Sequence, residues 1–202
     1  MVLDVLNFAG IAVFAASGAM LGVRKDFDMW GIITVGVLTG VGGGVLRDVL
    51  LGITPPASIS GWGPIVTATV AGLVVFFFHP AFTALHRSIL VLDAFGMGLF
   101  AATGASIALD VGASPFAATT VGLLTAVGGG VLRDMISNEI PLLLTPADLD
   151  AVPAVLGAAI VAVGATYTSA AHWIWLVVGS VLATALRLVS LRFALRLPTA
   201  RR

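Results

Sequence analysis

Long apolar stretches, separated by short polar or proline-containing segments, follow one another along almost the whole chain. A helix needs about 20 predominantly apolar residues to cross roughly 30 Å of hydrocarbon. Seven stretches reach or approach that length, and the pattern predicts a transmembrane helix over each of them: Leu3–Val23, Trp30–Leu51, Ile65–Phe78, Ile89–Leu109, Pro115–Ile136, Val152–Tyr167 and Trp173–Leu191.

The apolar pattern also repeats within the chain. A shift of 86 residues aligns Leu6–Pro55 with Leu92–Pro141 without a gap, and 21 of the 50 positions are identical. Gly42–Asp48 (Gly-Gly-Gly-Val-Leu-Arg-Asp) recurs letter for letter at Gly128–Asp134, which shared apolar composition alone does not explain. We therefore predict a first three-helix repeat (residues 1–85), a second repeat (86–170), and a seventh helix with a short basic tail (171–202).

Three helices per repeat is an odd number, so the second repeat should enter the membrane from the opposite side. Cations follow the first predicted helix at Arg24 and Lys25 and precede the fourth at Arg87. The positive-inside rule places such residues in the cytoplasm. Together with the arginines after the last helix, they predict inverted repeats with the N-terminus outside and the C-terminus cytoplasmic: Arg192, Arg196, Arg201 and Arg202.

Composition indicates that lipid is the main solvent of the surface. Hydrophobic residues make up 59% of the chain, charged residues 10%, and the mean hydropathy is +1.11. Soluble domains carry about 25% charged residues. Because only helices and closed barrels satisfy their backbone groups in lipid, the unbroken apolar stretches predict an all-α, polytopic membrane protein.

The same composition argues against several functions. A net charge of zero gives no overall basic field for nucleic acid, and the absence of cysteine rules out disulfides and thiolate metal sites. The three histidines are scattered near predicted helix ends: His79, His86 and His172. With no catalytic triad and no phosphate-binding loop in the sequence, we expect no catalytic residues, no metal site, no cofactor and no enzymatic activity.

The glycine triplets Gly42, Gly43, Gly44 and Gly128, Gly129, Gly130 lie near the middle of the second and fifth predicted helices. Each glycine costs about 1 kcal/mol in a helix interior relative to alanine. Small residues also allow two helices to pack closely, but one glycine per turn would suffice for that. A kinked or unwound turn with exposed carbonyls explains all three glycines, and we expect this arrangement in both helices.

An Arg-Asp pair follows each triplet inside the apolar segment: Arg47 with Asp48, and Arg133 with Asp134. Each such charge costs about 2.5–3.5 kcal/mol on insertion scales and marks a water-filled path by default. The alternatives are a snorkelling arginine or a self-neutralising pair that joins two helices. The symmetric repetition beside the triplets favours pore-lining or gating groups.

Four further polar residues occupy matching repeat positions: Asn7 with Asp93, and Ser17 with Thr103. An ionisable group one turn inside a helix, such as Asp93, favours an aqueous lining. Serine and threonine hydroxyls can instead bond the carbonyl four residues earlier in their own helix. We include all four among the candidate pore-lining residues.

Doubled Gly-Gly-Gly-Val-Leu-Arg-Asp motifs in about 200 residues resemble the prokaryotic members of the trimeric intracellular cation channel family. The resemblance implies a homotrimer in a bacterial plasma membrane, surrounded by membrane lipids, and it implies no other protein partner. As the charge balance already indicates, we expect no nucleic-acid partner. It also implies a pore inside each protomer, K⁺ as the permeant ion, and the glycine triplets as kink residues. The long Lys-rich tail and the Lys-Glu-Val motif of animal members are absent, so phosphoinositide binding is not carried over.

Two other interpretations remain open. The same domain type has been labelled a glycine transporter, and an Arg-Asp pair suits the carboxylate and ammonium of a zwitterion. A non-transporting assembly protein is a further alternative, although charges inside the membrane do not favour it.

Overall fold

The computed structural model describes residues 1–79, 85–145 and 149–195, and within these ranges the chain is helical and contains no strand. In these described ranges, seven long helices are accompanied by the short helix α3 and the 3-10 helix η2. Their bounds are α1 (Val2–Arg24), α2 (Met29–Leu50), α3 (Ala57–Ser60), α4 (Trp62–Phe78), α5 (Leu85–Asp110), α6 (Pro115–Ile136), η2 (Leu142–Leu144), α7 (Ala151–Tyr167) and α8 (His172–Phe193).

A long helix lies over each of the seven predicted stretches. Among the described residues, α1, α2, α5, α6 and α8 are long and apolar enough to cross a membrane, whereas α4 and α7 are shorter apolar helices of 17 residues. The prediction of an all-helical protein with several membrane-spanning helices is confirmed. Arg196, Arg201 and Arg202 lie outside the described residues.

Helices α2 and α6 begin at matching repeat positions with matching caps. The Asp28 carboxylate accepts a hydrogen bond from the Gly31 amide at 2.7 Å, and the Ser114 hydroxyl accepts one from the Ala117 amide at 3.3 Å. Such side chains satisfy amide groups that lack a partner in the first helical turn. The two caps fix where α2 and α6 enter the bundle.

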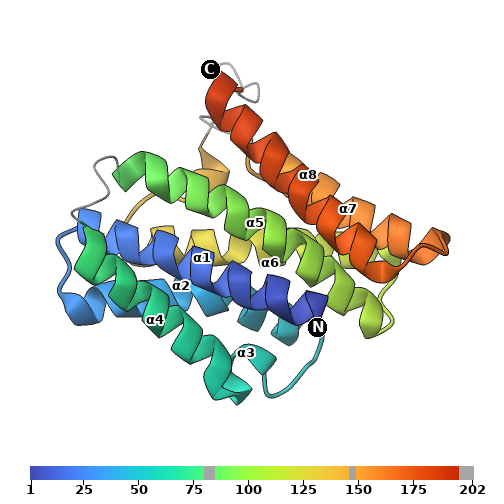
Figure 1. Ribbon diagram of the computed structural model, residues 1–202, viewed down its shortest axis with the longest axis horizontal. Helices are drawn as coiled ribbons and strands as arrows, with labels where there is room; N and C mark the ends of the chain where they lie inside the picture. Colours follow the sequence, from blue (N-terminus) through green and yellow to red (C-terminus); the bar gives the residue numbers. More distant parts are fainter. Residues whose placement is uncertain (80–84, 146–148, 196–202) are drawn as a thin grey trace.

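Four helices form the centre of the bundle, with the others at its sides (Figure 1). Helix α1 packs against α2 and α5, and α6 packs against α5 and α2. Helix α4 covers α1 and α2, while α7 covers α6 and α5 and pairs with α8. The flanking helices of the two repeats therefore cover equivalent central pairs.

The two repeats meet at a pair of buried aromatic rings. Phe14 of α1 and Phe100 of α5 occupy matching positions, and their ring centroids lie 5.2 Å apart. Each ring lies over a glycine of the opposite helix, Gly96 below Phe14 and Gly10 below Phe100. A side chain at either glycine would collide with the ring, so these positions require the absence of a Cβ.

The glycine triplets lie where α2 and α6 cross, and both helices continue through them as α-helix. The expectation of an unwound turn is therefore wrong, whereas a kink within continuous helix stays a prediction. A Cβ on Gly43 would lie less than 3.0 Å from the Thr125 carbonyl oxygen, and one on Gly129 equally close to the Thr39 carbonyl oxygen. Since Thr39 and Thr125 are repeat partners, this contact is reciprocal. Close helix packing, the alternative considered for the triplets, explains these central glycines.

Candidate functional site: two buried arginine–aspartate centres

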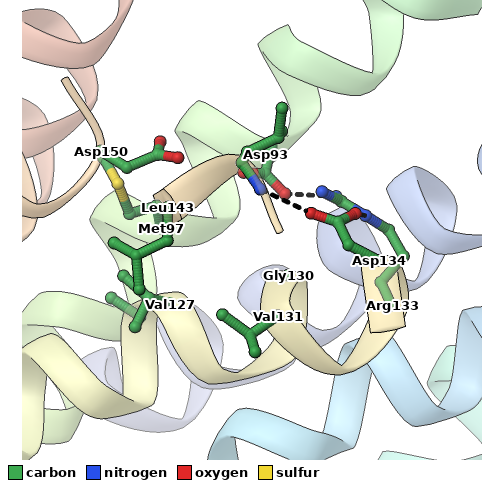
Figure 2. A pocket seen from close by; sticks show the side chains of 11 residues that line it. Asp93, Met97, Val127, Gly130, Val131, Arg133, Asp134, Leu143 and Asp150 are labelled. Carbon is green, nitrogen blue, oxygen red and sulfur yellow. Dashed lines mark hydrogen bonds and ion pairs between the residues drawn. The ribbon is translucent and has the colours of Figure 1, made fainter. Parts of the chain in front are cut away.

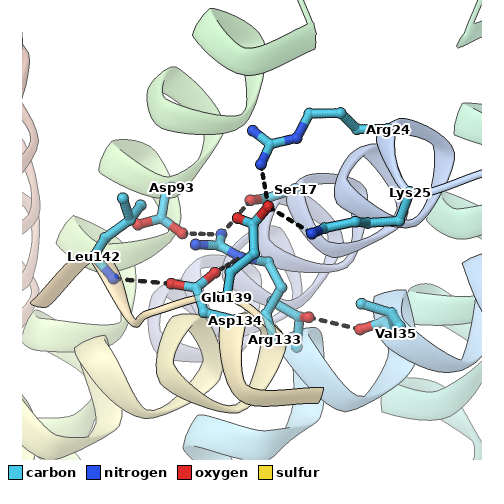
Figure 3. A network of polar contacts seen from close by, with 10 residues as sticks. Ser17, Arg24, Lys25, Val35, Asp93, Arg133, Asp134, Glu139 and Leu142 are labelled. Carbon is cyan, nitrogen blue, oxygen red and sulfur yellow. Dashed lines mark hydrogen bonds and ion pairs between the residues drawn. The ribbon is translucent and has the colours of Figure 1, made fainter. Parts of the chain in front are cut away.

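The first centre surrounds Arg133 in the last turns of α6, where this side chain is only 1% exposed. Its Nε donates to Asp134 at 2.8 Å, its Nη1 donates to the Ser17 hydroxyl at 2.6 Å, and the same Nη1 is paired with Asp93. Figure 3 shows these partners converging from α1, α5 and α6. The second oxygen of Asp134 accepts the Leu142 amide at 3.0 Å and so anchors η2.

Burial makes these pairings obligatory. Asp93 and Asp134 are also buried, so water cannot solvate the three charged groups fully. Removing one partner of a buried ion pair leaves an uncompensated charge, which typically costs about 3–5 kcal/mol. The Arg133 centre therefore holds α1, α5, α6 and η2 in one arrangement.

A small cavity adjoins this centre (Figure 2). Its volume is about 20 Å³, and Asp93, Arg133, Asp134 and Asp150 are among the residues that line it. A cavity of this size has room for about one water molecule. Polar groups around such a space can exchange hydrogen bonds with water without opening the bundle.

The second centre surrounds Arg47 in the last turn of α2, where the side chain is 3% exposed. Its Nε and Nη2 both lie 2.8 Å from the same oxygen of Asp48. The other oxygen of Asp48 accepts the Ala57 amide at 2.8 Å, at the start of α3. Each repeat thus uses the aspartate of its motif to anchor the short helical element that follows.

The predicted polar residues do not all join these centres. Ser17 and Asp93 bind Arg133, whereas no hydrogen bond within the described ranges joins Arg47 to Asn7 or Thr103. The Thr103 hydroxyl instead donates to the Leu99 carbonyl at 2.9 Å in its own helix. The two centres are related by the repeat in position but differ in their partners.

A third cluster of charged residues, more exposed than the two arginine centres, joins the C-terminal ends of α1 and α6. Glu139 pairs with Arg24 and lies 3.0 Å from the Lys25 ammonium. Partial burial opposes ionisation of this carboxyl, but hydrogen bonds and charge from Lys25 and Arg24 outweigh it and lower the pKa of Glu139 below the ordinary 4.5. The ionised carboxylate is therefore the form that stabilises this contact.

The lowered pKa gives a testable dependence on pH. A carboxyl whose pKa is depressed by folding adds stability above its unfolded pKa and loses it as the pH falls through the folded value. We expect Glu139→Gln to lower the unfolding free energy by at most about 1 kcal/mol at neutral pH, because such pairs are partly solvated. Thermal unfolding in detergent should show this difference at pH 7 and a progressively smaller one as the pH is lowered below 4.5. An equal difference at both pH values would contradict the assignment.

Comparisons with known proteins agree with this architecture. Residues 4–80 and 90–166 each match the family model described as "Glycine transporter", and the two matches begin 86 residues apart, the same shift as the repeat. A "UPF0126 membrane protein" of Deinococcus radiodurans is 38% identical over 97% of this chain and 91% of its own length.

Solved structures give the more specific likeness. The trimeric intracellular cation channel orthologue from Rhodobacter sphaeroides has a TM-score of 0.90 at 34% identity, over 96% of this chain and 98% of that one. A second structure, described as showing the basis for conductance through TRIC cation channels, has a TM-score of 0.89 at 37% identity, over 100% and 98%. The chain belongs to the trimeric intracellular cation (TRIC) channel family. It is a multi-pass membrane protein, as its curated relatives and its long apolar helices indicate.

The described part of this TRIC-family chain also contains a buried ion pair that was not predicted from the sequence. Arg187 of α8 is fully buried, and its Nη2 lies 2.6 Å from a carboxylate oxygen of Asp150. The available signal was an arginine within the last predicted helix. It was overlooked because neither residue lies in the aligned part of the repeat.

Proposed function

We propose that this protein is a cation channel that conducts K⁺ through a pore inside each protomer of a homotrimer. The main support is the agreement, over almost the whole chain and at more than 30% identity, with solved structures described as TRIC cation channels. Because those structures are described as channels, they support a channel function and not an enzymatic one. The central helices α1, α2, α5 and α6 are the proposed pore helices, and the glycine triplets lie at the proposed constriction. Any bend of α2 or α6 at the triplets would occur without a break in the helix.

Arg47 and Arg133 are the proposed pore-lining or gating groups of this pore. An unpaired positive charge repels K⁺, so a cation pathway requires each arginine to be neutralised by carboxylates or to close the path. Both arginines are buried and engaged by aspartates, and α2 and α6 are in contact at the triplets. These contacts support a closed conformation that opens when arginine–aspartate contacts and helices rearrange.

A glycine carrier is supported less well. Such a carrier would need a free arginine for the substrate carboxylate and space for the substrate beside it. Arg47 has one buried nitrogen, Nη1, without a partner among the described residues, but Asp48 engages its Nε and Nη2. Arg133 already binds two carboxylates and a hydroxyl, and the adjoining cavity of about 20 Å³ holds roughly one water molecule. A glycine zwitterion needs more room than a single water molecule.

We further propose seven membrane crossings, with inverted repeats and the N-terminus outside in a bacterial plasma membrane. Contacts between helix ends support this topology. Two contacts join helix ends that are assigned to the cytoplasm. Glu139 pairs with Lys25, and the Leu149 amide donates to the Ser190 hydroxyl at 3.2 Å. The Ser106 hydroxyl and His172 Nε2, 2.7 Å apart, join ends assigned to the outside.

Single cysteines test the topology, since the chain contains none of its own. We expect Ser60→Cys, at an exposed position in α3, to react with an impermeant thiol reagent added outside. Ile140→Cys, 73% exposed beside Glu139, should react only when the reagent reaches the cytoplasmic face. Labelling of both from one side would exclude the inverted topology.

Purified protein in liposomes tests the function itself. We expect a K⁺ gradient to drive K⁺ flux through vesicles that contain the protein, with no flux in protein-free vesicles. The same preparation should show no saturable uptake of labelled glycine. Saturable glycine uptake without K⁺ flux would favour the carrier.

A further inference from the structure

The two buried arginines occupy matching positions but are held with unequal strength. Asp93 of α5 supplies Arg133 with a second carboxylate, whereas the matching residue of α1 is the uncharged Asn7. The hydroxyl that binds Arg133 comes from Ser17, but the matching Thr103 bonds to its own helix. Arg133 is therefore fixed to three side chains on three helices, and Arg47 to Asp48 alone.

Arg47 also has a nitrogen with no partner. Its Nη1 is buried, and no acceptor in the described part of the chain lies within hydrogen-bonding distance. A buried donor without an acceptor is unfavourable, because it has lost its water and gained nothing in return. Movement of Arg47 away from this position breaks contacts with one carboxylate and lets Nη1 find water or another acceptor. The equivalent movement of Arg133 would break contacts with two carboxylates and a hydroxyl.

We propose that Arg47 is the movable gate and Arg133 the fixed anchor of the pore, and that Asn7 determines this difference. The proposal rests on the channel function proposed above. In the closed protein Arg47 lies against Asp48, and opening displaces its guanidinium while the Arg133 centre keeps α1, α5 and α6 together. A carboxylate at position 7 would give Arg47 the second partner that Arg133 already has and would hold the gate closed.

The substitution Asn7→Asp tests this directly in single-channel records. The repeat partner of this position holds an aspartate that binds an arginine, and by the symmetry of the repeats we expect an aspartate at position 7 to lie toward Arg47 in the same way. A charge-assisted hydrogen bond formed only in the closed state should lower the open probability about ten-fold. The added negative charge by itself would attract cations and raise the unitary conductance, which the same records measure separately.

Two controls separate restraint of Arg47 from a general charge effect. Ser60→Asp adds the same charge at an exposed site at the same end of the pore, and it should leave the open probability unchanged. In an Arg47→Gln background, Asn7→Asp should cause no further fall, because the partner of the new carboxylate is gone. Thermal unfolding gives an independent measure: Asn7→Asp should raise the midpoint when Arg47 is present and not when it is glutamine.

The outcomes distinguish this inference from the function on which it rests. No cation current in the parent protein would refute the channel and the gate together. A normal parent current with an unchanged open probability in Asn7→Asp would refute the gate alone. An equal fall in open probability when Asn7→Asp is added to Arg47→Gln would also refute the gate. If Asn7→Asp conducts poorly because it misfolds, its unfolding midpoint falls in both backgrounds, which also contradicts the proposal.

Discussion

Replacing Arg133 by methionine should lower the unfolding free energy by about 3–5 kcal/mol, the largest effect we expect from a single substitution. The reason is the pair of carboxylates that it would leave behind. Asp93 and Asp134 are buried on either side of the guanidinium, and methionine neutralises neither of them. Thermal or denaturant unfolding of the purified protein in detergent, followed by tryptophan fluorescence, measures the loss.

Two matched variants show whether charge is the cause. Arg24→Met removes an arginine that is about one-third exposed, with side-chain exposure of 32%, and should cost no more than about 1 kcal/mol. Arg133→Met combined with Asp93→Asn and Asp134→Asn removes the whole set of charges and should recover much of the lost stability, since uncharged replacements of buried ion networks are often tolerated. A triple variant as unstable as Arg133→Met alone would show that side-chain volume and not charge controls this site.

The second large effect is expected at the helix crossing, where Gly129→Ala should destabilise the protein by about 1–3 kcal/mol. The added methyl would lie less than 3.0 Å from the Thr39 carbonyl oxygen of α2, so the two helices must separate. Gly130→Ala, at the neighbouring position, is the matched control because it adds the same methyl group where there is room for it. Its methyl would lie 3.5 Å from Asp93, an ordinary contact, and alanine favours the helix by about 1 kcal/mol.

The comparison of these two glycines decides the origin of the triplets. We expect Gly129→Ala to have a lower unfolding midpoint than the parent protein. The midpoint of Gly130→Ala should equal or exceed that of the parent. Equal destabilisation by both changes would mean that helix packing is not the constraint at Gly129.

Much of the fold could be predicted from sequence because hydrophobic length reports directly on helices in lipid. Pro115–Ile136 was predicted with the bounds that α6 has, and α1 was predicted within one residue at each end. The elements α3 and η2 were not predicted. They are three or four residues long, and their positions depend on the amide contacts of Asp48 and Asp134, which are tertiary interactions.

The candidate site was predictable in its residues and not in its contacts. Charges inside apolar segments identified both Arg-Asp pairs, and the repeat identified Asp93 with Asn7 as a matched position. Sequence could not show that Arg133 binds Asp93 while Arg47 has no equivalent partner, because that depends on how α1, α5 and α6 pack. The unwound turn was wrong for a related reason. The cost of three glycines was attributed to local conformation, whereas the central glycines are required by the backbone of the opposing helix.

Single-channel recording of the purified protein in a planar bilayer, with unequal KCl concentrations on the two sides, tests the central claim most directly. The account predicts unitary currents that reverse close to the K⁺ equilibrium potential, with altered open probability in Arg47→Ala. An absence of unitary currents would contradict it, above all if the same preparation took up labelled glycine saturably and lost that uptake in both Arg47→Ala and Arg133→Ala.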